Sequence, residues 1–430
     1  MTTLASTDIQ TTSEAGQNYR PAMAVMTLLF FMWGFLTVLN DILVPHFKAI
    51  FDLNYTRVML IQFTFFSAYF LLSLPSGKIL AWIGYKRSLI TGLLIMGIGA
   101  LMFLPAASRS SYPLFLTALF VLAAGMTVLQ VAANPYVAML GQPETASSRL
   151  NLAQAVNSLG TAIAPWLGGL IILSGTLKSS EEMRQLSAEQ LTAYRIAEAS
   201  SVKTPYLGFA AILFLLAIGV ALFKLPLIKS IEQGGAEAII QGKAYHSAWK
   251  VRHLVLGAVG IGVYVGAEVS IGSFLVNFFS QPEIGGLSEK VAARYVSYYW
   301  MGAMIGRFAG SAILQRAKPG KLLGWSALVA TLLVWTTIFS TGHVAMWAII
   351  SVGLFNSIMW SNIFTLAIDG LGKLTSQGSS ILIMGILGGA VIPVAQGALA
   401  DTIGIQHAFV LPALCYLYII YYGFWGHRHV

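Results

Sequence analysis

Charged residues and cysteine are both scarce in this sequence of 430 residues. Charged residues make up 10% of the chain, against roughly a quarter in soluble domains, whereas 57% of the residues are hydrophobic. Cys415 is the single cysteine, which excludes a disulfide framework, a cysteine-ligated zinc site and an iron–sulfur cluster. The mean hydropathy of +0.75 is higher than an aqueous core could accommodate. The composition therefore predicts a protein that resides in a lipid bilayer.

The sequence also lacks features that other classes of protein need. The net charge of +9 is spread over loops, without the basic and aromatic patches of a protein that binds nucleic acid. The seven histidines form no cluster with metal-ligand spacing, and no nucleophile elbow is present. We therefore expect no metal site and no cofactor, and a polytopic membrane enzyme is the least favoured alternative.

Twelve apolar stretches follow a polar N-terminal tail at residues 1–21. The tail lacks the basic start and apolar run of a signal peptide, so we expect it to be cytoplasmic and disordered. Each stretch is near the roughly 20 residues that cross about 30 Å of hydrocarbon. The predicted spans are residues 22–46, 57–81, 87–106, 112–139, 151–175, 205–224, 252–279, 291–315, 321–340, 343–368, 378–400 and 407–426. The predicted fold class is all-α integral membrane.

The polar segment 225–251 divides these spans into six plus six. We expect an N-terminal six-helix bundle at residues 22–224, a cytoplasmic linker at 225–251 and a C-terminal six-helix bundle at 252–430. Most of the 25 lysine and arginine residues lie on the cytoplasmic side if both termini are cytoplasmic. Because basic residues favour the cytoplasmic side of membrane proteins, we expect this orientation.

The two halves repeat one another at a spacing of 228 residues. The shift pairs Pro165 with Pro393, Gly169 with Gly397, and Asn134 with Asn362. It also brings Asp41 to within one residue of Glu268. Two parallel six-helix repeats are typical of the major facilitator architecture, in which substrate binds between the halves near the midplane.

Two acidic residues, Asp41 and Glu268, lie well inside predicted spans. A charge near the bilayer centre is costly, so such an acid indicates a functional site, with a hydrogen-bonded structural carboxyl as the alternative. Trp33, Thr37 and Asp41 follow i, i+4 spacing, and so do Tyr264 and Glu268. Each acid therefore shares a predicted helix face with an aromatic side chain.

Uncharged amides and a further tryptophan occur in the fourth, fifth and tenth spans. They are Gln130, Asn134, Gln154, Asn157, Asn356, Trp360 and Asn362. Amides and carboxylates form paired hydrogen bonds with adjacent hydroxyls, and an aromatic face covers the apolar side of a sugar ring. We therefore expect these groups, with Trp33 and Tyr264, to bind a neutral polyhydroxyl ligand. The alternative is that the amides join helices to one another.

No buried basic residue is expected beside Asp41 or Glu268. Arg307 lies in the segment Gly306–Gly310, where we expect it to govern helix packing and gating at the cytoplasmic face. An acid buried without a counter-ion favours its protonated form, which permits proton coupling. We expect Asp41 and Glu268 to couple proton movement to transport, with sodium as the alternative coupling ion.

Five segments resemble a known family. They are LFFMWGFLTVLNDILVPHFK (29–48), VLQVAANPYVAMLG (128–141), PETASSRLNLAQAVNSLG (143–160), HLVLGAVGIGVYVGAEVSIGSFLVNF (253–278) and GLFNSIMW (353–360). On these segments the chain resembles the fucose-galactose-glucose:proton symporter family of the major facilitator superfamily, above all its bacterial glucose/galactose branch. The segment LSAEQLTAYR (186–195) is similar to the L-fucose branch. The resemblance runs through all twelve spans and implies a bacterial inner membrane protein.

The resemblance also implies roles for individual residues. Asp41 corresponds to the acid that the L-fucose branch uses in proton coupling. That branch has a second acid where this chain has Gln130, whereas the glucose/galactose branch has Gln there and an acid at the position of Glu268. We therefore expect the second carboxyl to be Glu268. Gln154, Asn157 and Trp360 are implied as sugar contacts, the last in place of a Tyr in the L-fucose branch.

The sequence and the resemblance together favour a proton-coupled hexose symporter, for glucose or galactose, that works by alternating access. We expect a monomer whose partners are a monosaccharide and the bilayer. An N-acetylglucosamine or L-fucose symporter and a sodium-coupled sugar symporter remain alternatives. A multidrug antiporter is less favoured, because its cavity should be more apolar and carry fewer amides.

Overall fold

The computed structural model describes residues 18–51, 55–171, 185–187, 189–191, 194, 203–226, 238–240 and 243–428. The side chains of residues 39–51, 55–59, 165–171, 238, 239 and 289 lie outside this description. So do most of the predicted N-terminal tail and much of the predicted linker.

The N-terminal bundle is built from five long helices. They are α1 (Arg20–Phe51), α2 (Tyr55–Ser108), α3 (Tyr112–Met139), α4 (Ala146–Ile171) and α7 (Lys203–Leu222), with the short 3-10 helix η1 (Pro143–Thr145) before α4. Helix α2 contains the second and third predicted spans, which meet at Gly84, where φ is 77°. Only glycine adopts this conformation readily, so Gly84 supplies the turn that the sequence places between these two spans.

The C-terminal bundle repeats this plan with more interruptions. Its helices are α9 (Arg252–Phe279), α10 (Glu289–Ile313), α11 (Pro319–Phe339), α12 (Gly342–Asn356), α13 (Met359–Ile368), α14 (Thr375–Met384), α15 (Gly388–Ile403), α16 (Ile405–Ala408) and α17 (Val410–Tyr421). Short helices η2 (Ala248–Lys250), η3 (Gly372–Leu374), η4 (Gly385–Leu387) and η5 (Tyr422–Gly426) extend or join them. The tenth and eleventh predicted spans are thus each broken near the middle, between α12 and α13 and at η4.

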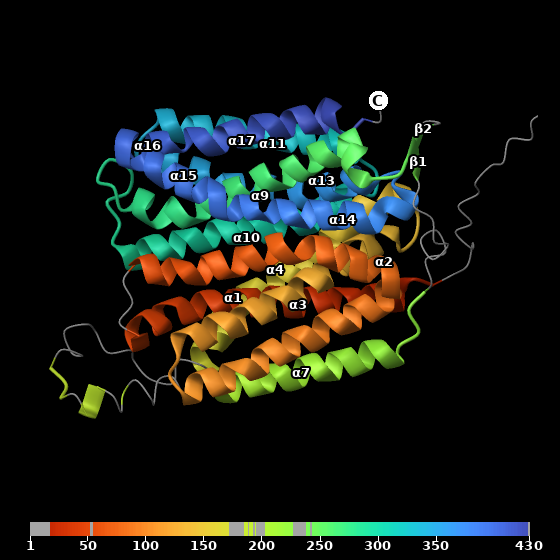
Figure 1. The fold of residues 1–430 in the computed structure, drawn as a ribbon. Coiled ribbons are helices and arrows are strands. Elements are labelled where there is room, and N and C mark those ends of the chain that lie inside the picture. Colours follow the sequence, from red (N-terminus) through yellow and green to blue (C-terminus); the bar gives the residue numbers. More distant parts are fainter. Residues whose placement is uncertain are drawn as a thin grey trace, which may run out of the picture.

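The two bundles lie side by side, with the N-terminal helices in orange and yellow-green below the C-terminal helices in green and blue (Figure 1). They meet where α4 contacts α10 and where α2 contacts α14. Strands β1 (Ala238–Ile240) and β2 (Lys243–Tyr245) form an antiparallel hairpin at one end of the molecule, near the C-terminus. We call this the linker end.

Nine helical stretches of the described residues are long and apolar enough to cross a membrane. One of them, Leu60–Ser108, spans 49 residues and accounts for two predicted spans. The remaining two predicted spans correspond to α4 and α10, which are less hydropathic because they carry polar side chains. The predicted all-α membrane fold of twelve spans is therefore confirmed, and the two least apolar spans are among those that supply polar groups to the interior.

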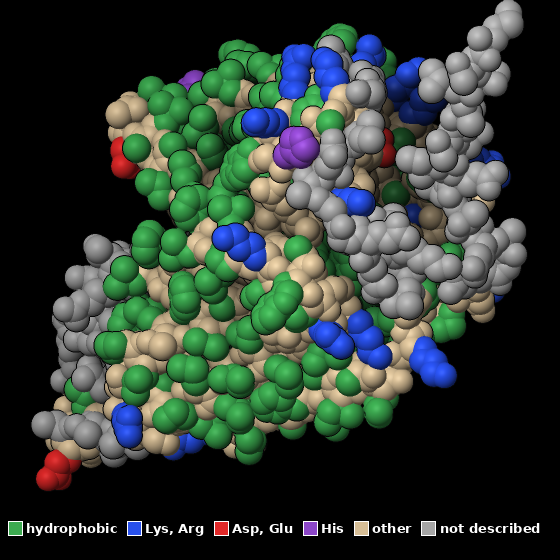
Figure 2. All heavy atoms as spheres, turned by 45° about the vertical axis from the view of Figure 1, so that its right-hand side comes forward, with side chains coloured by type: hydrophobic (Ala, Val, Ile, Leu, Met, Phe, Trp, Pro, Cys, Tyr) green, Lys and Arg blue, Asp and Glu red, His purple; other side chains and the backbone are tan. Residues whose placement is uncertain are grey.

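The molecular surface fits a protein embedded in lipid. Large apolar side chains are exposed around the flank, among them Phe63, Leu215 and Phe339 at 66%, 66% and 80% exposure. Figure 2 shows these flanks covered by hydrophobic side chains, while most lysine and arginine side chains in view gather toward the linker end. The surface is also indented between the two bundles at the left of that view.

Candidate functional site

A cavity of about 240 Å³ lies between the two bundles. The N-terminal bundle lines it with Trp33, Gly34, Thr37, Phe65, Phe66, Tyr69, Gln130, Gln154, Asn157 and Thr161. The C-terminal bundle lines it with Tyr264, Val265, Glu268, Val269, Arg307, Ser357, Trp360, Ser361 and Ile386. The volume is below the roughly 300–1,000 Å³ typical of sites for drug-sized ligands. The cavity therefore suits a small ligand held between two bodies.

Seven of the residues predicted from the sequence line this cavity together. They are Trp33, Gln130, Gln154, Asn157, Tyr264, Glu268 and Trp360. They come from α1, α3, α4, α9 and α13, which are far apart in the sequence. The i, i+4 spacing of Tyr264 and Glu268 places both on one face of α9, as predicted.

The amides from the N-terminal bundle are held by hydrogen bonds that leave oxygen atoms for a ligand. Gln130 Nε2 donates to the Tyr69 hydroxyl at 2.6 Å, and Gln130 Oε1 is buried without a partner among the described residues. Asn157 Nδ2 donates to the backbone carbonyl of Phe30 at 2.7 Å. This bond joins α4 to α1 and fixes the amide beside the cavity. Each amide thus keeps a carbonyl oxygen that can accept a hydrogen bond from a hydroxyl.

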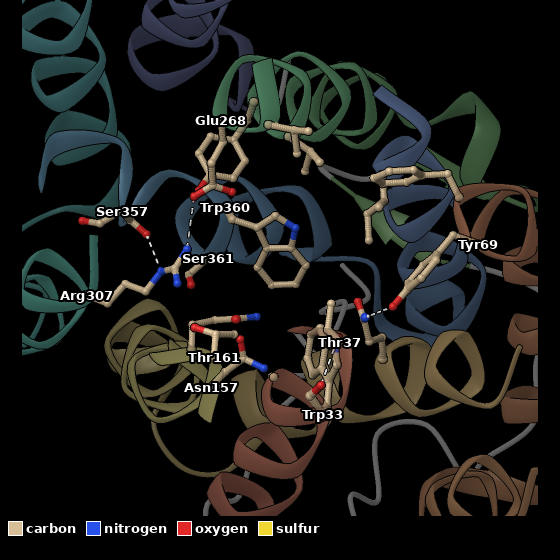
Figure 3. Close-up of a pocket in the computed structure, with 18 of the residues that line it drawn as sticks. Trp33, Thr37, Tyr69, Asn157, Thr161, Glu268, Arg307, Ser357, Trp360 and Ser361 are labelled. Carbon is tan, nitrogen blue, oxygen red and sulfur yellow. Dashed lines mark hydrogen bonds and ion pairs between the residues drawn. The ribbon is translucent and has the colours of Figure 1, made fainter. Parts of the chain in front are cut away.

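Two tryptophans form apolar walls on opposite sides of the cavity. Trp33 enters from α1 and Trp360 from α13 (Figure 3). Trp360 stacks on Phe364, with ring centroids 5.1 Å apart and planes 15° apart, and Trp33 packs against Phe30 at 5.1 Å. Because both rings are braced from behind, their remaining faces are available to the C–H groups of a ligand.

Glu268 is paired with a positive charge. Its Oε1 lies 3.3 Å from Arg307 Nη2 and accepts a hydrogen bond from the Tyr264 hydroxyl at 2.8 Å (Figure 3). The prediction that no buried basic residue accompanies the acids is therefore wrong for Glu268. Glu268 is therefore not an isolated acid, and the argument from its isolation no longer applies to it.

Arg307 lines the cavity rather than the cytoplasmic face where we expected it. It precedes the end of α10 at Ile313 by six residues, or about 9 Å along the helix axis. Its Nε donates to the Ser357 carbonyl at 3.3 Å and its Nη1 donates to the Ser158 hydroxyl. The rule that we apply to Asp41 and Glu268 also applies to Arg307: a charged residue well inside a span indicates a functional site.

Three predicted amides do not line the cavity. Asn356 donates to the hydroxyls of Tyr299 and Tyr416, at 2.7 and 3.3 Å, inside the C-terminal bundle. Asn134 donates to the Gln130 carbonyl of its own helix at 2.9 Å. Asn362 accepts from Asn151 at 3.2 Å across the contact between bundles. Asn356 and Asn362 thus join helices, which is the alternative that the sequence left open, whereas Asn134 bonds to its own helix.

Asp41 belongs to α1, one helical turn beyond Thr37, but its side chain lies outside the described residues. Its predicted roles in proton coupling and ligand binding therefore remain predictions. Tyr69, Phe65 and Phe66 were not predicted, because their apolar stretch in α2 carries no pattern that distinguishes a cavity wall from a lipid-facing surface.

The comparisons with known proteins agree with this architecture. Residues 23–393 match the family described as Major Facilitator Superfamily. The chain is 52% identical to the glucose/galactose transporter of Brucella abortus biovar 1 (strain 9-941), covering 98% of this chain and 97% of the relative. It is 36% identical to the L-fucose-proton symporter of Escherichia coli (strain K12), covering 98% of both.

A solved structure gives the same result for the fold. The crystal structure of a major facilitator transporter, FucP, in the outward conformation superposes with a TM-score of 0.87 at 36% identity, covering 95% of this chain and 99% of that one. The chain is therefore a multi-pass membrane protein that belongs to the Major Facilitator Superfamily.

Proposed function

We propose that this protein is a proton-coupled symporter of a neutral hexose, glucose or galactose, that works by alternating access. The observation that carries the proposal is the cavity between the bundles, which combines amide oxygens, two tryptophans that pack against phenylalanines and one ion pair. Relatives that span nearly the whole chain are described as a glucose/galactose transporter and an L-fucose-proton symporter, which supports a monosaccharide as the cargo.

The charge state of the cavity favours an uncharged ligand. Glu268 and Arg307 neutralise each other at 3.3 Å, so a charged ligand would leave one of the three charges without a partner. Gln130, Gln154 and Asn157 offer neutral donors and acceptors to hydroxyl groups. A lipophilic drug would leave these amides unsatisfied, which disfavours the multidrug antiporter.

We assign the two acids different tasks. Glu268 accepts a hydrogen bond from a sugar hydroxyl, since we identify no partner for its Oε2 among the described residues. Asp41 remains the proposed proton carrier and sugar ligand on α1, on the ground that its i, i+8 spacing from Trp33 places both on one helix face. Sodium is the alternative coupling ion.

Hydrogen bonds between the bundles suggest which side of the cavity is closed. They link Ser147 with Thr365 at 2.5 Å, Ser148 with the Ser311 carbonyl at 2.7 Å, and Ser379 with the Val131 carbonyl at 2.8 Å. Along α4, the residues that make these bonds precede Gln154, so they lie between the cavity and the linker end. We propose that the cavity opens at the opposite end in this conformation, that the linker end is cytoplasmic, and that the bacterial inner membrane holds the protein.

Uptake by reconstituted protein tests the function. Proteoliposomes should accumulate labelled glucose or galactose when a proton gradient is imposed, and should not do so with a sodium gradient alone. N-acetylglucosamine and L-fucose in the same panel test the alternative cargos. Absence of accumulation of every sugar under both gradients would contradict the proposal.

A further inference from the structure

Arg307 contacts both bundles at the edge of the cavity. Within the C-terminal bundle its guanidinium is 3.3 Å from Glu268 on α9 and donates to the Ser357 carbonyl between α12 and α13. Its Nη1 donates to the hydroxyl of Ser158 on α4 of the N-terminal bundle. The side chains of Arg307 and Glu268 are each 14% exposed, so the contacts form in a nearly enclosed place.

The local packing fixes where this arginine can lie. A Cβ atom on the preceding residue, Gly306, would come within 2.4 Å of the Leu354 carbonyl, so glycine allows α10 to approach α12 closely. The break that follows α12 at Asn356 presents the Ser357 carbonyl to Arg307. The bonds to Glu268 and to the Ser357 carbonyl therefore hold the guanidinium to its own bundle, whereas the bond to Ser158 depends on the position of the other bundle.

The Ser158 hydroxyl acts as an acceptor toward Arg307. Its own proton is donated to the Gln154 carbonyl at 3.0 Å, which leaves a lone pair for the guanidinium. An alcohol hydroxyl with this geometry is chemically the same acceptor that a sugar hydroxyl would present. Because Arg307 lines the cavity and Gln154 lies beside it, a bound sugar can compete with Ser158 for the same N–H group.

We propose that Arg307 is a positioning residue that latches the two bundles together through Ser158, and that a sugar hydroxyl releases this latch by replacing the serine. The release step rests on the proposed sugar transport, whereas the latch itself does not. The ion pair with Glu268 keeps the guanidinium in place during the exchange. Occupation of the cavity thereby weakens one bond that joins the two bundles at the level of the cavity.

The proposal predicts an unusual phenotype for Ser158→Ala. A hydrogen bond to a charged group contributes enough that its loss should raise the ratio of separated to joined bundles about tenfold or more. By reciprocity, galactose should bind more tightly by a comparable factor, since it no longer has to displace the serine. A residue that only maintained the fold would weaken sugar binding when removed. Ser158→Thr keeps the hydroxyl and should restore both properties.

The linker-end distance can be measured with spin labels. Gln142 follows α3 in the N-terminal bundle and Gln315 follows α10 in the C-terminal bundle, and both are exposed. Each is replaced by cysteine in a Cys415→Ser background, and double electron–electron resonance is recorded with and without galactose. The matched control is Ser326→Ala, because Ser326 lies on α11, whose helix contacts are within the C-terminal bundle.

The expected result is a shift to longer Gln142–Gln315 distances in Ser158→Ala without sugar, and a galactose-induced shift in the parent and in Ser326→Ala. Unchanged distances in Ser158→Ala, or weaker galactose binding by this variant, would overturn the proposal. If galactose fails to bind even the parent protein, the proposed function fails, and the distances measured without sugar still decide whether Arg307 and Ser158 form a latch.

Discussion

Arg307 Nη2 lies 3.3 Å from Glu268 Oε1, at the wall of the cavity that separates the two bundles. The acid that faces the cavity is thus one member of an ion pair. This relationship changes the mechanism expected from the sequence, since it leaves Asp41 as the acid proposed to carry the proton. Because their charges are opposite, Arg307 and Glu268 together add no net charge to the cavity, which suits a neutral sugar.

Removal of Arg307 should be more harmful than removal of the pair. Arg307→Gln leaves the Glu268 carboxylate without its counter-ion, whereas Arg307→Gln combined with Glu268→Gln removes both charges. We expect the double variant to be more stable, by about 1–3 kcal/mol, than the summed effects of the two single substitutions would give. This energy is measured by thermal unfolding, in detergent, of the wild type, Arg307→Gln, Glu268→Gln and the double variant. If the double variant loses as much stability as the two single variants lose together, the two residues are not coupled.

Asp41→Asn should abolish accumulation of sugar driven by a proton gradient. The neutral amide cannot release a proton, but it can still accept a hydrogen bond from a hydroxyl. Exchange of labelled for unlabelled galactose, which needs no net proton movement, should therefore persist. Uptake and exchange are measured on the same proteoliposomes. Wild-type accumulation by this variant would remove Asp41 from the mechanism.

The two tryptophans should contribute to sugar affinity. Trp33→Ala or Trp360→Ala should weaken galactose binding about two- to tenfold, because an aromatic face contributes about 0.5–1.5 kcal/mol beyond its area. Phenylalanine at either position should preserve most of the affinity. Trp325 is a suitable control, since it lies on α11 and is 58% exposed. Equal losses in Trp325→Ala would mean that the effect does not arise in the cavity.

The amides should divide into two classes. Gln154→Ala should lower galactose affinity with little change in stability, because Gln154 lines the cavity. Asn356→Ala should destabilise the protein by about 1–3 kcal/mol, because it removes a donor to two buried tyrosine hydroxyls. Binding isotherms and melting temperatures of both variants separate the classes. The reverse pattern would contradict the assignment of either residue.

Most of the fold follows from the sequence, because a bilayer requires long apolar helices and the roughly 20-residue length of a span is easily counted. The breaks at Ser357 and at η4 were not predicted, since no proline interrupts the sequence at either place. The positions of Tyr264 and Glu268 were predictable because helical spacing determines which residues share a face.

Contacts between helices were harder to predict. Asn134, Asn356 and Asn362 have the same chemistry as Gln154, and only tertiary packing decides which amides face the cavity and which join helices. The glycine-spaced segment Gly306–Gly310 predicts a cytoplasmic position for Arg307, whereas the side chain lines the cavity. Its partner Glu268 is 39 residues away, and no local pattern relates the two.

Binding of galactose to the purified protein tests the central claim, that the cavity between the bundles holds a monosaccharide. The measurement is a titration of wild-type protein and of a variant that combines Gln154→Ala with Trp360→Ala. We predict saturable binding that glucose displaces, and at least about tenfold weaker binding by the variant, since it loses both a hydrogen bond and an aromatic wall. Saturable binding of a lipophilic cation in place of the sugar, or equal sugar affinity in both proteins, would contradict the account.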